Sequence, residues 1–196
     1  PRMQFLPRRH AYCTVDTAGS GRWRCITLRE GPNTRVTFSS EPEGCEGGGL
    51  GCAVQAFDGL ADQPGLGDGG GGDGTVNLNY WHSAETAAMP HWIAYDLGSA
   101  TALCSYAIVA RNAACCYESD SPRDWQLHGY DPSSPADSGA PDEVDGWHVL
   151  DVRWGQSGWK AGERRSYLLA PPSGLRLHQL YKLHVSAVGD NSRGVL

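Results

Sequence analysis

The sequence predicts an all-β fold, an antiparallel β-sandwich, and three observations support this expectation. Short apolar runs alternate with segments rich in Gly, Pro, Ser, Asp and Asn, as in proteins built from strands and long loops. Glycine is abundant, with 26 residues, and no segment carries the pattern of a capped amphipathic helix. A chain of 196 residues is long enough to bury a core of its own. We therefore expect one sandwich domain, with an extension.

Residues 1–33 are expected to form this extension. Two short strand patterns, "AYCTVD" and "RWRCITL", lie on either side of a Gly-Ser-Gly turn at 19–21. Cys13 and Cys25 flank the turn at a spacing that suits a local disulfide. We predict a β-hairpin closed by this disulfide, followed by the sandwich domain at residues 34–196.

The sandwich strands are expected to follow one another from residue 35 onward. They are the segments 35–40, 91–98, 103–111, 124–131, 147–154, 164–170 and 180–188, and segment 53–59 continues the same rhythm. The Gly-rich tract 65–75 cannot hold a packed element, and the polar segment 132–146 shows no apolar periodicity. Both are expected to be loops.

Several aromatic residues are assigned to the core on the basis of this pattern. Trp81, Trp125 and Leu127 are expected to fill it, and Gly98 is expected to turn the chain after the strand 91–98, with a positive φ. The tryptophans of segment 147–159 could form a stripe for binding sugars, but packing at strand ends is the simpler interpretation. They are Trp147, Trp154 and Trp159.

Seven cysteines indicate an oxidising compartment, since this is a high count for a cytosolic protein of this size. Cys45 and Cys52 flank a Gly-rich loop, and Cys104 is expected to pair with Cys115 or Cys116. An odd count leaves one thiol free or bonded to another chain, although buried, unbonded cysteines are the alternative. The sequence contains no CxxC pair, so a zinc site is not expected. We predict a secreted or lumenal protein, and the start at Pro1 is that of a processed or partial chain.

Charge and hydropathy exclude some partners. The net charge of -6 argues against nucleic acid as a partner. No apolar run reaches the length of a transmembrane helix.

The order of the motifs resembles the discoidin, or coagulation-factor type C (F5/8 type C), family. The motifs are "VTFSSEPEG", "AVQAFDGL", "YWHSAE", "PHWIAYDLGSA", "YAIVARN", "DSPRDWQLHGYD", "WHVLD", "RRSYLLA" and "LYKLHVSAVGD". The resemblance runs from about Thr34 to the end and implies a galactose-binding-like jelly roll. The preceding hairpin is not part of the family, and the chain ends where the family's last strand should begin. A missing strand would leave an open sheet edge.

The resemblance also implies a shallow sugar-binding groove, built from loops at one end of the sandwich. Such a groove needs an aromatic surface and a few fixed polar groups. The positions that match are Asn79, His82 and Glu85 around Trp81, and Arg111, Asn112, Tyr117 and Asp120 in the loop after strand 103–111. The alternative is that Arg111 only pairs with a surface carboxylate such as Asp120.

Calcium is the one cofactor that the resemblance implies. Asp58 matches the family's calcium-binding turn, with Asp62 and Thr75 as further ligands, although Asp58-Gly59 could equally be a simple turn. Relatives that bind lipid carry apolar loop tips, whereas the tips here are Gly/Asp-rich or acidic, so we do not expect membrane binding.

No enzymatic motif is present in the sequence. H-E-x-x-H and G-x-S-x-G are both absent, and His82-x-x-Glu85 is expected in a loop rather than on a metal-binding helix. Two functions therefore remain. The first is an extracellular, non-catalytic module for adhesion or glycan binding, with a glycan or glycoprotein as its partner. The second is a structural subunit that docks on other proteins through the open sheet edge or a free cysteine.

Overall fold

The structure, a computed structural model, describes part of the chain. The described residues are 2–4, 11–15, 23–27, 35–40, 53, 56, 81–84, 87–110, 119–132, 143–144, 146–169 and 177–189; residues 2–4, 11–15, 23–27, 35 and 143–144 are described by their backbone alone.

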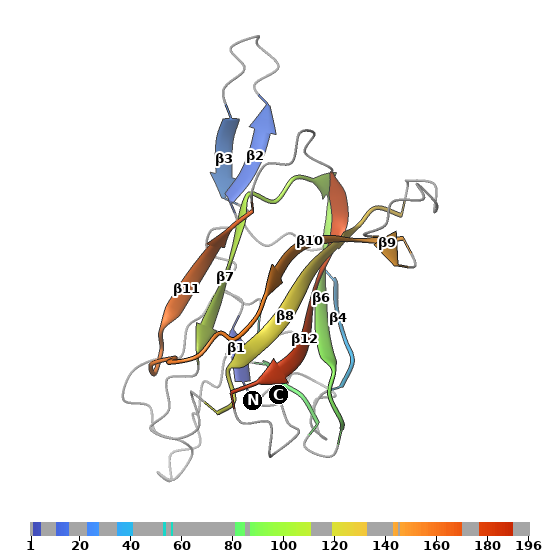
Figure 1. Ribbon diagram of the computed structural model, residues 1–196. Helices are drawn as coiled ribbons and strands as arrows, with labels where there is room; N and C mark the ends of the chain where they lie inside the picture. The colour runs from blue at the N-terminus through green and yellow to red at the C-terminus, as the bar shows by residue number, and fades with distance from the viewer. Residues whose placement is uncertain are drawn as a thin grey trace, which may run out of the picture.

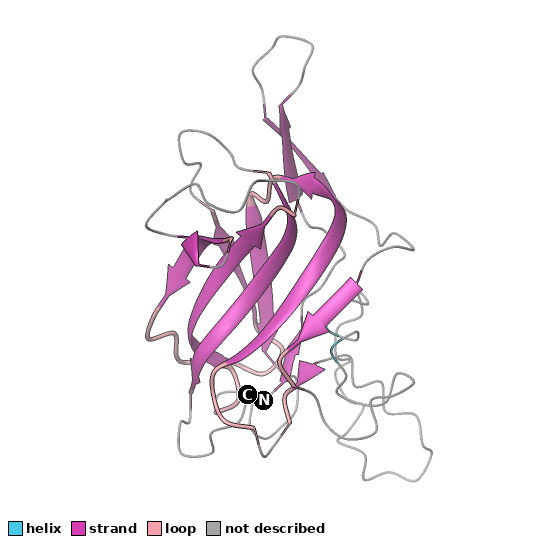
Figure 2. Ribbon diagram, turned by 90° about the vertical axis from the view of Figure 1, so that its right-hand side faces the viewer, coloured by secondary structure: helices cyan, strands magenta, loops and turns pink. Residues whose placement is uncertain are grey.

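The described residues form an antiparallel β-sandwich without α-helices, as the sequence predicts (Figures 1 and 2). The four-stranded sheet has the order β11 (Arg164–Leu168), β7 (Ser105–Ala110), β1 (Arg2–Gln4), β5 (Trp81–His82). The six-stranded sheet has the order β4 (Arg35–Phe38), β6 (His91–Thr101), β12 (His178–Val188), β8 (Pro122–Tyr130), β10 (Trp147–Arg153), β9 (Glu143–Val144). No helix in the described ranges is long and apolar enough to cross a membrane.

The core lies between the two sheets and contains the residues expected there. Trp125 is fully buried, and Leu127 and Trp81 are almost fully buried. Trp125 and Leu127 share one face of β8 because they are two residues apart on a strand. From the opposite sheet, Ile108 of β7 packs into the same cluster.

A buried polar network also joins the two sheets. The Tyr106 hydroxyl of β7 donates to Asp151 Oδ2 of β10 at 2.7 Å, and Trp125 Nε1 donates to the Tyr106 hydroxyl at 2.8 Å. Arg153 Nε donates to the same Asp151 oxygen at 2.8 Å. Burial above all, followed by the hydrogen bond to Asp151, raises the pKa of Tyr106 far above its usual range.

Trp154 and Trp159 differ in burial, and the prediction that both are packed is wrong for Trp154. Trp159 is buried, whereas Trp154 is 61% exposed and Trp147 is half-buried. The reason is strand alternation: Arg153 pairs with Trp125 and faces the core side, so Trp154 must face outward. Gly155, with a φ of 64°, then turns the chain away from the sheet.

Gly98 has the predicted positive φ, of 72°, but it does not end its strand. β6 continues to Thr101, because the residues around Gly98 bulge out between the pairs Asp96–Leu180 and Thr101–His178. Asp96 Oδ1 accepts a hydrogen bond from Gly98 N at 2.7 Å and stabilises this bulge.

The N-terminal segment differs in one respect from the expected extension. β2 (Ala11–Val15) and β3 (Trp23–Thr27) pair as a separate hairpin, with Cys13 opposite Cys25. β1, however, pairs with both β7 and β5 and thus belongs to the sandwich.

Two further segments differ from the expected pattern. Ala53 and Ala56 are buried in short 3₁₀ turns rather than in a strand. Within the polar segment 132–146, β9 adds a short strand to β10. Cys104 is disulfide-bonded, and the side chains of the other six cysteines lie outside the described residues.

Candidate functional site

The two segments that carry most of the predicted groove residues leave the sandwich from neighbouring strands. Met3 of β1 pairs with Ala110 at the end of β7 on one side and with Trp81 of β5 on the other. Ala110 and Trp81 are therefore separated by two strand spacings, about 10 Å. β5 and β7 both end here, at the lower end of the sandwich in Figure 1, which we call the site end.

A hydrogen-bonded frame holds β5 at the site end. Trp81 Nε1 donates to the Ser40 carbonyl at 3.0 Å, and Ala84 N donates to Ser40 Oγ at 3.2 Å. His91 Nδ1 lies 3.4 Å from Ser40 Oγ and 3.5 Å from Ser39 Oγ. The residues that follow β4 thus fix both the indole of Trp81 and the backbone after His82.

His91 is a structural part of this frame. Its side chain is buried, and this burial lowers the pKa of the imidazole, against a smaller raising effect of the Ala87 backbone. Both serine hydroxyls lie against the same ring nitrogen, Nδ1, and since a hydroxyl can donate or accept, they suit either tautomer of the neutral imidazole. Ser39, Ser40 and His91 carry no sequence signal of this role, since Ser-Ser before a loop and a His at the start of a strand are common patterns.

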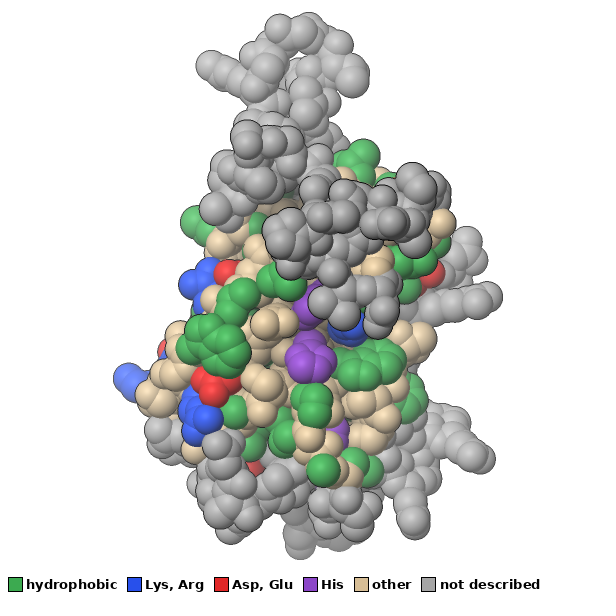
Figure 3. Space-filling view, turned by 45° about the vertical axis from the view of Figure 1, so that its right-hand side comes forward, with side chains coloured by type: hydrophobic (Ala, Val, Ile, Leu, Met, Phe, Trp, Pro, Cys, Tyr) green, Lys and Arg blue, Asp and Glu red, His purple; other side chains and the backbone are tan. Residues whose placement is uncertain are grey.

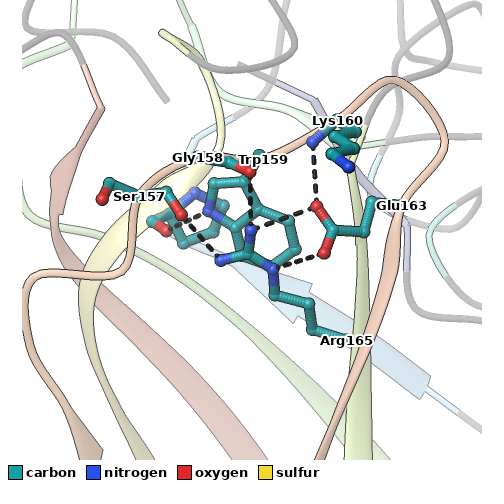
Figure 4. A network of polar contacts seen from close by, with 7 residues as sticks. Ser157, Gly158, Trp159, Lys160, Glu163 and Arg165 are labelled. Atoms are coloured by element: carbon teal, nitrogen blue, oxygen red, sulfur yellow. Dashed lines mark hydrogen bonds and ion pairs between the residues drawn. The ribbon is translucent and has the colours of Figure 1, made fainter.

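A rigid loop between β10 and β11 forms a second part of the site end (Figure 4). Arg165 lies over the Trp159 ring at 4.0 Å and donates to the carbonyls of Ser157 and Gly158 at 3.0 and 2.9 Å. Its Nε also donates to Glu163 Oε1 at 2.9 Å, and the pair lowers the pKa of the carboxyl. These interactions fold the loop 154–163 onto itself.

The loop 154–163 is also tied to both ends of the segment 111–121. Ala110 N donates to the Glu163 carbonyl at 2.9 Å, at the point where this segment begins. Trp159 Nε1 donates to the Pro122 carbonyl at 3.1 Å, at the point where it ends. The structure thus provides a fixed frame around the segment that carries Arg111.

Two of the predicted groove residues are described. His82 is half-buried at the end of β5, in a strand rather than in the expected loop, because Arg2 of β1 pairs with it. Its Nδ1 donates to the Ser83 carbonyl. Asp120 is half-buried in the turn before β8, where it accepts a hydrogen bond from Ser119 Oγ at 2.9 Å.

The other predicted site residues lie outside the described residues and stay predictions. They are Asn79, Glu85, Arg111, Asn112 and Tyr117 for the groove, and Asp58, Asp62 and Thr75 for calcium. Within the described part of the chain, no group of three or more His, Cys, Asp or Glu residues could hold a metal ion.

Known structures with the same architecture include proteins of the class that the sequence resembles. An F5/8 type C domain from Bacteroides fragilis matches with a TM-score of 0.51 and 13% identity, over 78% of this chain and 81% of that chain. Striped bass (Morone saxatilis) serum fucolectin matches with a TM-score of 0.51 and 14% identity, over 83% of this chain and 43% of that chain. A family 32 carbohydrate-binding module of Clostridium perfringens NanJ, solved with galactose, matches with a TM-score of 0.49 and 13% identity, over 79% of this chain and 83% of that chain.

The fold is therefore the discoidin-type, galactose-binding-like jelly roll of F5/8 type C domains, which confirms the resemblance seen in the sequence. A family model for a domain of unknown function, DUF5000, matches residues 70–183, more than half of the chain, and the chain belongs to this family. A comparison with curated proteins gives no match.

Proposed function

We propose that this chain is a non-catalytic, extracellular glycan-binding module with its ligand groove at the site end. One observation carries the proposal: β1 pairs with both β5 and β7, so that the ends of these two strands, from which the segments containing His82 and Arg111 continue, lie about 10 Å apart at one end of the sandwich. A lectin, the striped bass fucolectin, has the same fold, which supports the class of function.

The frame at the site end supports a binding role because it is preorganised. The stacked and hydrogen-bonded Arg165 fixes the loop 154–163, and Ser40 fixes the chain after β5. A groove whose walls are already ordered loses little conformational entropy when a sugar binds. In this proposal Arg111 and His82 hydrogen-bond to sugar hydroxyls. Asn79, Glu85, Asn112, Tyr117 and Asp120 complete the groove.

A glycan array tests this function. We expect the wild-type chain to give signals for a limited set of terminal sugars, with galactose, N-acetylgalactosamine and fucose among the probes. Arg111→Ala and His82→Ala should remove these signals, whereas Leu168→Ala should not, because Leu168 is 78% exposed on β11, away from β5. A blank array for wild type, or signals for the terminal sugars that survive in Arg111→Ala, would contradict the proposal.

Calcium at Asp58, Asp62 and Thr75 is a separate part of the proposal. Carboxylate and hydroxyl oxygens suit this cation. If the site exists, calcium should raise the melting temperature of the wild-type chain and leave that of Asp58→Asn unchanged. Equal melting curves of the wild-type chain with calcium and with a chelator would reject the site.

Docking on another protein is the second candidate, and exposed leucines on the described surface favour it. Leu168 lies on β11, at the edge of the four-stranded sheet, and Leu177, just before β12, is 53% exposed. Edge strands with exposed apolar side chains can pair with a further chain. Light scattering tests the simplest form, self-association: a wild-type dimer that Leu168→Asp dissociates would favour docking, and a monomer at all concentrations would oppose self-association.

A further inference from the structure

The outer face of the six-stranded sheet carries a row of side chains that no known role explains. The strand register lines up Trp92 of β6, His184 of β12, Gln126 of β8 and Val152 of β10, each directly opposite the next. Four neighbouring strands span about 14 Å from first to last. Trp154 lies two residues beyond Val152, on the same face and about 7 Å further along the direction of β10, and we call these five residues the strip.

The strip faces away from the core. Residues on either side of Gln126, namely Trp125 and Leu127, point inward, so Gln126 must point outward. Trp92, His184 and Gln126 are half-buried, and Val152 is exposed. Figure 3 shows histidine side chains in the middle of this face, with hydrophobic side chains to either side.

The polar groups in the middle of the strip are oriented by the protein. Gln126 Oε1 lies 3.1 Å from His128 Nε2, and since an amide oxygen only accepts, His128 Nε2 must donate. This contact leaves the Gln126 amide nitrogen as a donor for a ligand. Among the described residues, neither this nitrogen nor the His184 ring has a hydrogen-bond partner.

His128 itself adds an unsatisfied polar atom to the floor of the strip. It is only 8% exposed, its ring centroid lies 6.1 Å from that of His184, and among the described residues its Nδ1 has no hydrogen-bond partner. This nitrogen is buried too deeply to contact a ligand, so a polar ligand would bind through Gln126 and His184.

Hydrogen bonds fix the backbone that carries the exposed Trp154 indole at the end of the strip. Gly155 N donates to Asp124 Oδ1 at 2.6 Å, and Gln156 N donates to the Arg123 carbonyl at 2.9 Å. Gln156 Nε2 also donates to the Trp154 carbonyl at 3.1 Å. A large apolar ring on an ordered backbone provides contact area at little entropic cost.

We propose that the strip binds a neutral linear oligosaccharide that lies across the strands, on a surface distinct from the groove at the site end. Trp92 and Trp154 pack against the C–H faces of sugar rings near the two ends, and His184 and Gln126 hydrogen-bond to hydroxyls between them. The strip combines two tryptophan rings with amide and imidazole groups between them, and this is the chemistry that recognises the C–H face and the hydroxyls of a sugar. None of the five strip side chains carries a fixed charge, and Lys182, on the same face of β12, lies over the Trp147 ring at 4.0 Å, so we expect a neutral ligand.

Titration calorimetry with neutral β-1,4-linked hexasaccharides tests this proposal. The probes are the hexamers of glucose, xylose, mannose and N-acetylglucosamine, each with its disaccharide. Wild type should bind at least one hexamer more tightly than the corresponding disaccharide. Trp154→Ala should weaken this binding about tenfold, as expected when a large apolar contact is lost, and Gln126→Ala should weaken it as well.

Leu168→Ala is the matched control, since it removes an exposed apolar side chain outside the strip. Melting curves of all variants establish that they are folded. Hexamer binding should survive Arg111→Ala, which separates the strip from the site end. The proposal is overturned if no hexamer binds, if Trp154→Ala and Gln126→Ala bind like wild type, if Leu168→Ala weakens binding as much as they do, or if Arg111→Ala alone removes binding. It is also overturned if the strip variants change only self-association.

Discussion

Replacing Tyr106 with Phe removes a single hydroxyl that serves two hydrogen bonds between the sheets. The bond to Asp151 is charge-assisted and is worth about 1.5–3 kcal/mol. The bond from Trp125 satisfies a fully buried indole N–H, which would cost about 1–3 kcal/mol if left without an acceptor. Because such effects are not strictly additive, we expect Tyr106→Phe to lower the free energy of unfolding by about 3 kcal/mol.

Urea unfolding of the oxidised chain, followed by tryptophan fluorescence, measures this change. For a chain of this size, 3 kcal/mol corresponds to a fall in melting temperature of roughly 6–12 °C. Tyr167→Phe is the matched control: Tyr167 stacks on Tyr106 at 5.1 Å, and within the described part of the chain its buried hydroxyl forms no hydrogen bond of ordinary geometry. The reasoning is refuted if Tyr106→Phe costs less than about 1 kcal/mol, or if both variants lose the same stability.

Three further predictions concern the sheets and the loop at the site end. In Gly129→Ala the new Cβ would lie 2.4 Å from Cδ2 of the buried His178 ring, so the free energy of unfolding should fall by about 1–3 kcal/mol. In a His178→Ala background the same substitution should lower it by less. Burial, chiefly, lowers the pKa of His128 from 6.5 to about 4, so the unfolded chain binds this proton at a higher pH than the folded chain. The stability that neutral His128 provides is therefore fully present above pH 6.5, and the free energy of unfolding falls by about 2–3 kcal/mol as the pH falls toward 4. Urea titrations at several pH values should show a smaller fall in His128→Gln. Arg165→Lys keeps the charge but loses the forked donor and the stacking on Trp159, and the melting temperature should fall by roughly 2–6 °C.

Each of these expectations has a contrary result. Wild-type stability in Gly129→Ala would show that the ring of His178 moves aside at no cost. A pH dependence that is identical in His128→Gln would assign the effect to other groups. An unchanged melting temperature in Arg165→Lys would mean that the loop 154–163 is held without the guanidinium.

Much of the sandwich could be predicted because strand alternation and turn residues are local signals. Trp125 and Leu127 are separated by one polar residue, Gln126, and the large apolar side chains on this face of the strand predict that it meets the core. The strand β1 could not be predicted in the same way. It is three residues long, and its place between β7 and β5 depends on partners far away in the sequence.

The same distinction explains the corrections at Gly98 and Trp154. The sequence shows that Gly98 suits a positive φ, but whether the chain turns or bulges there depends on how β12 pairs with β6. Whether Trp154 is buried depends on which face of β10 meets the core, and this is set by the register with β8. A periodicity of two residues assigns side chains to opposite faces without saying which face is covered.

The candidate site was predictable only through the resemblance. His82 and Asp120 carry no local pattern that marks them as ligand-binding. They come to the same end of the sandwich because Trp159, in the loop bound to Ala110 at the end of β7, donates to the Pro122 carbonyl where β8 begins. The strip is likewise invisible in the sequence, because Trp92, His184, Gln126 and Val152 come from four separate segments that only the register aligns.

Calorimetric titration with the strongest glycan from the array tests the central claim most directly. We expect a measurable, saturable heat with one terminal sugar for the wild-type chain and its loss in Arg111→Ala, with melting curves that show both chains folded. No binding by the folded wild-type chain, or equal affinity in the two chains, would contradict a glycan-binding groove at the site end.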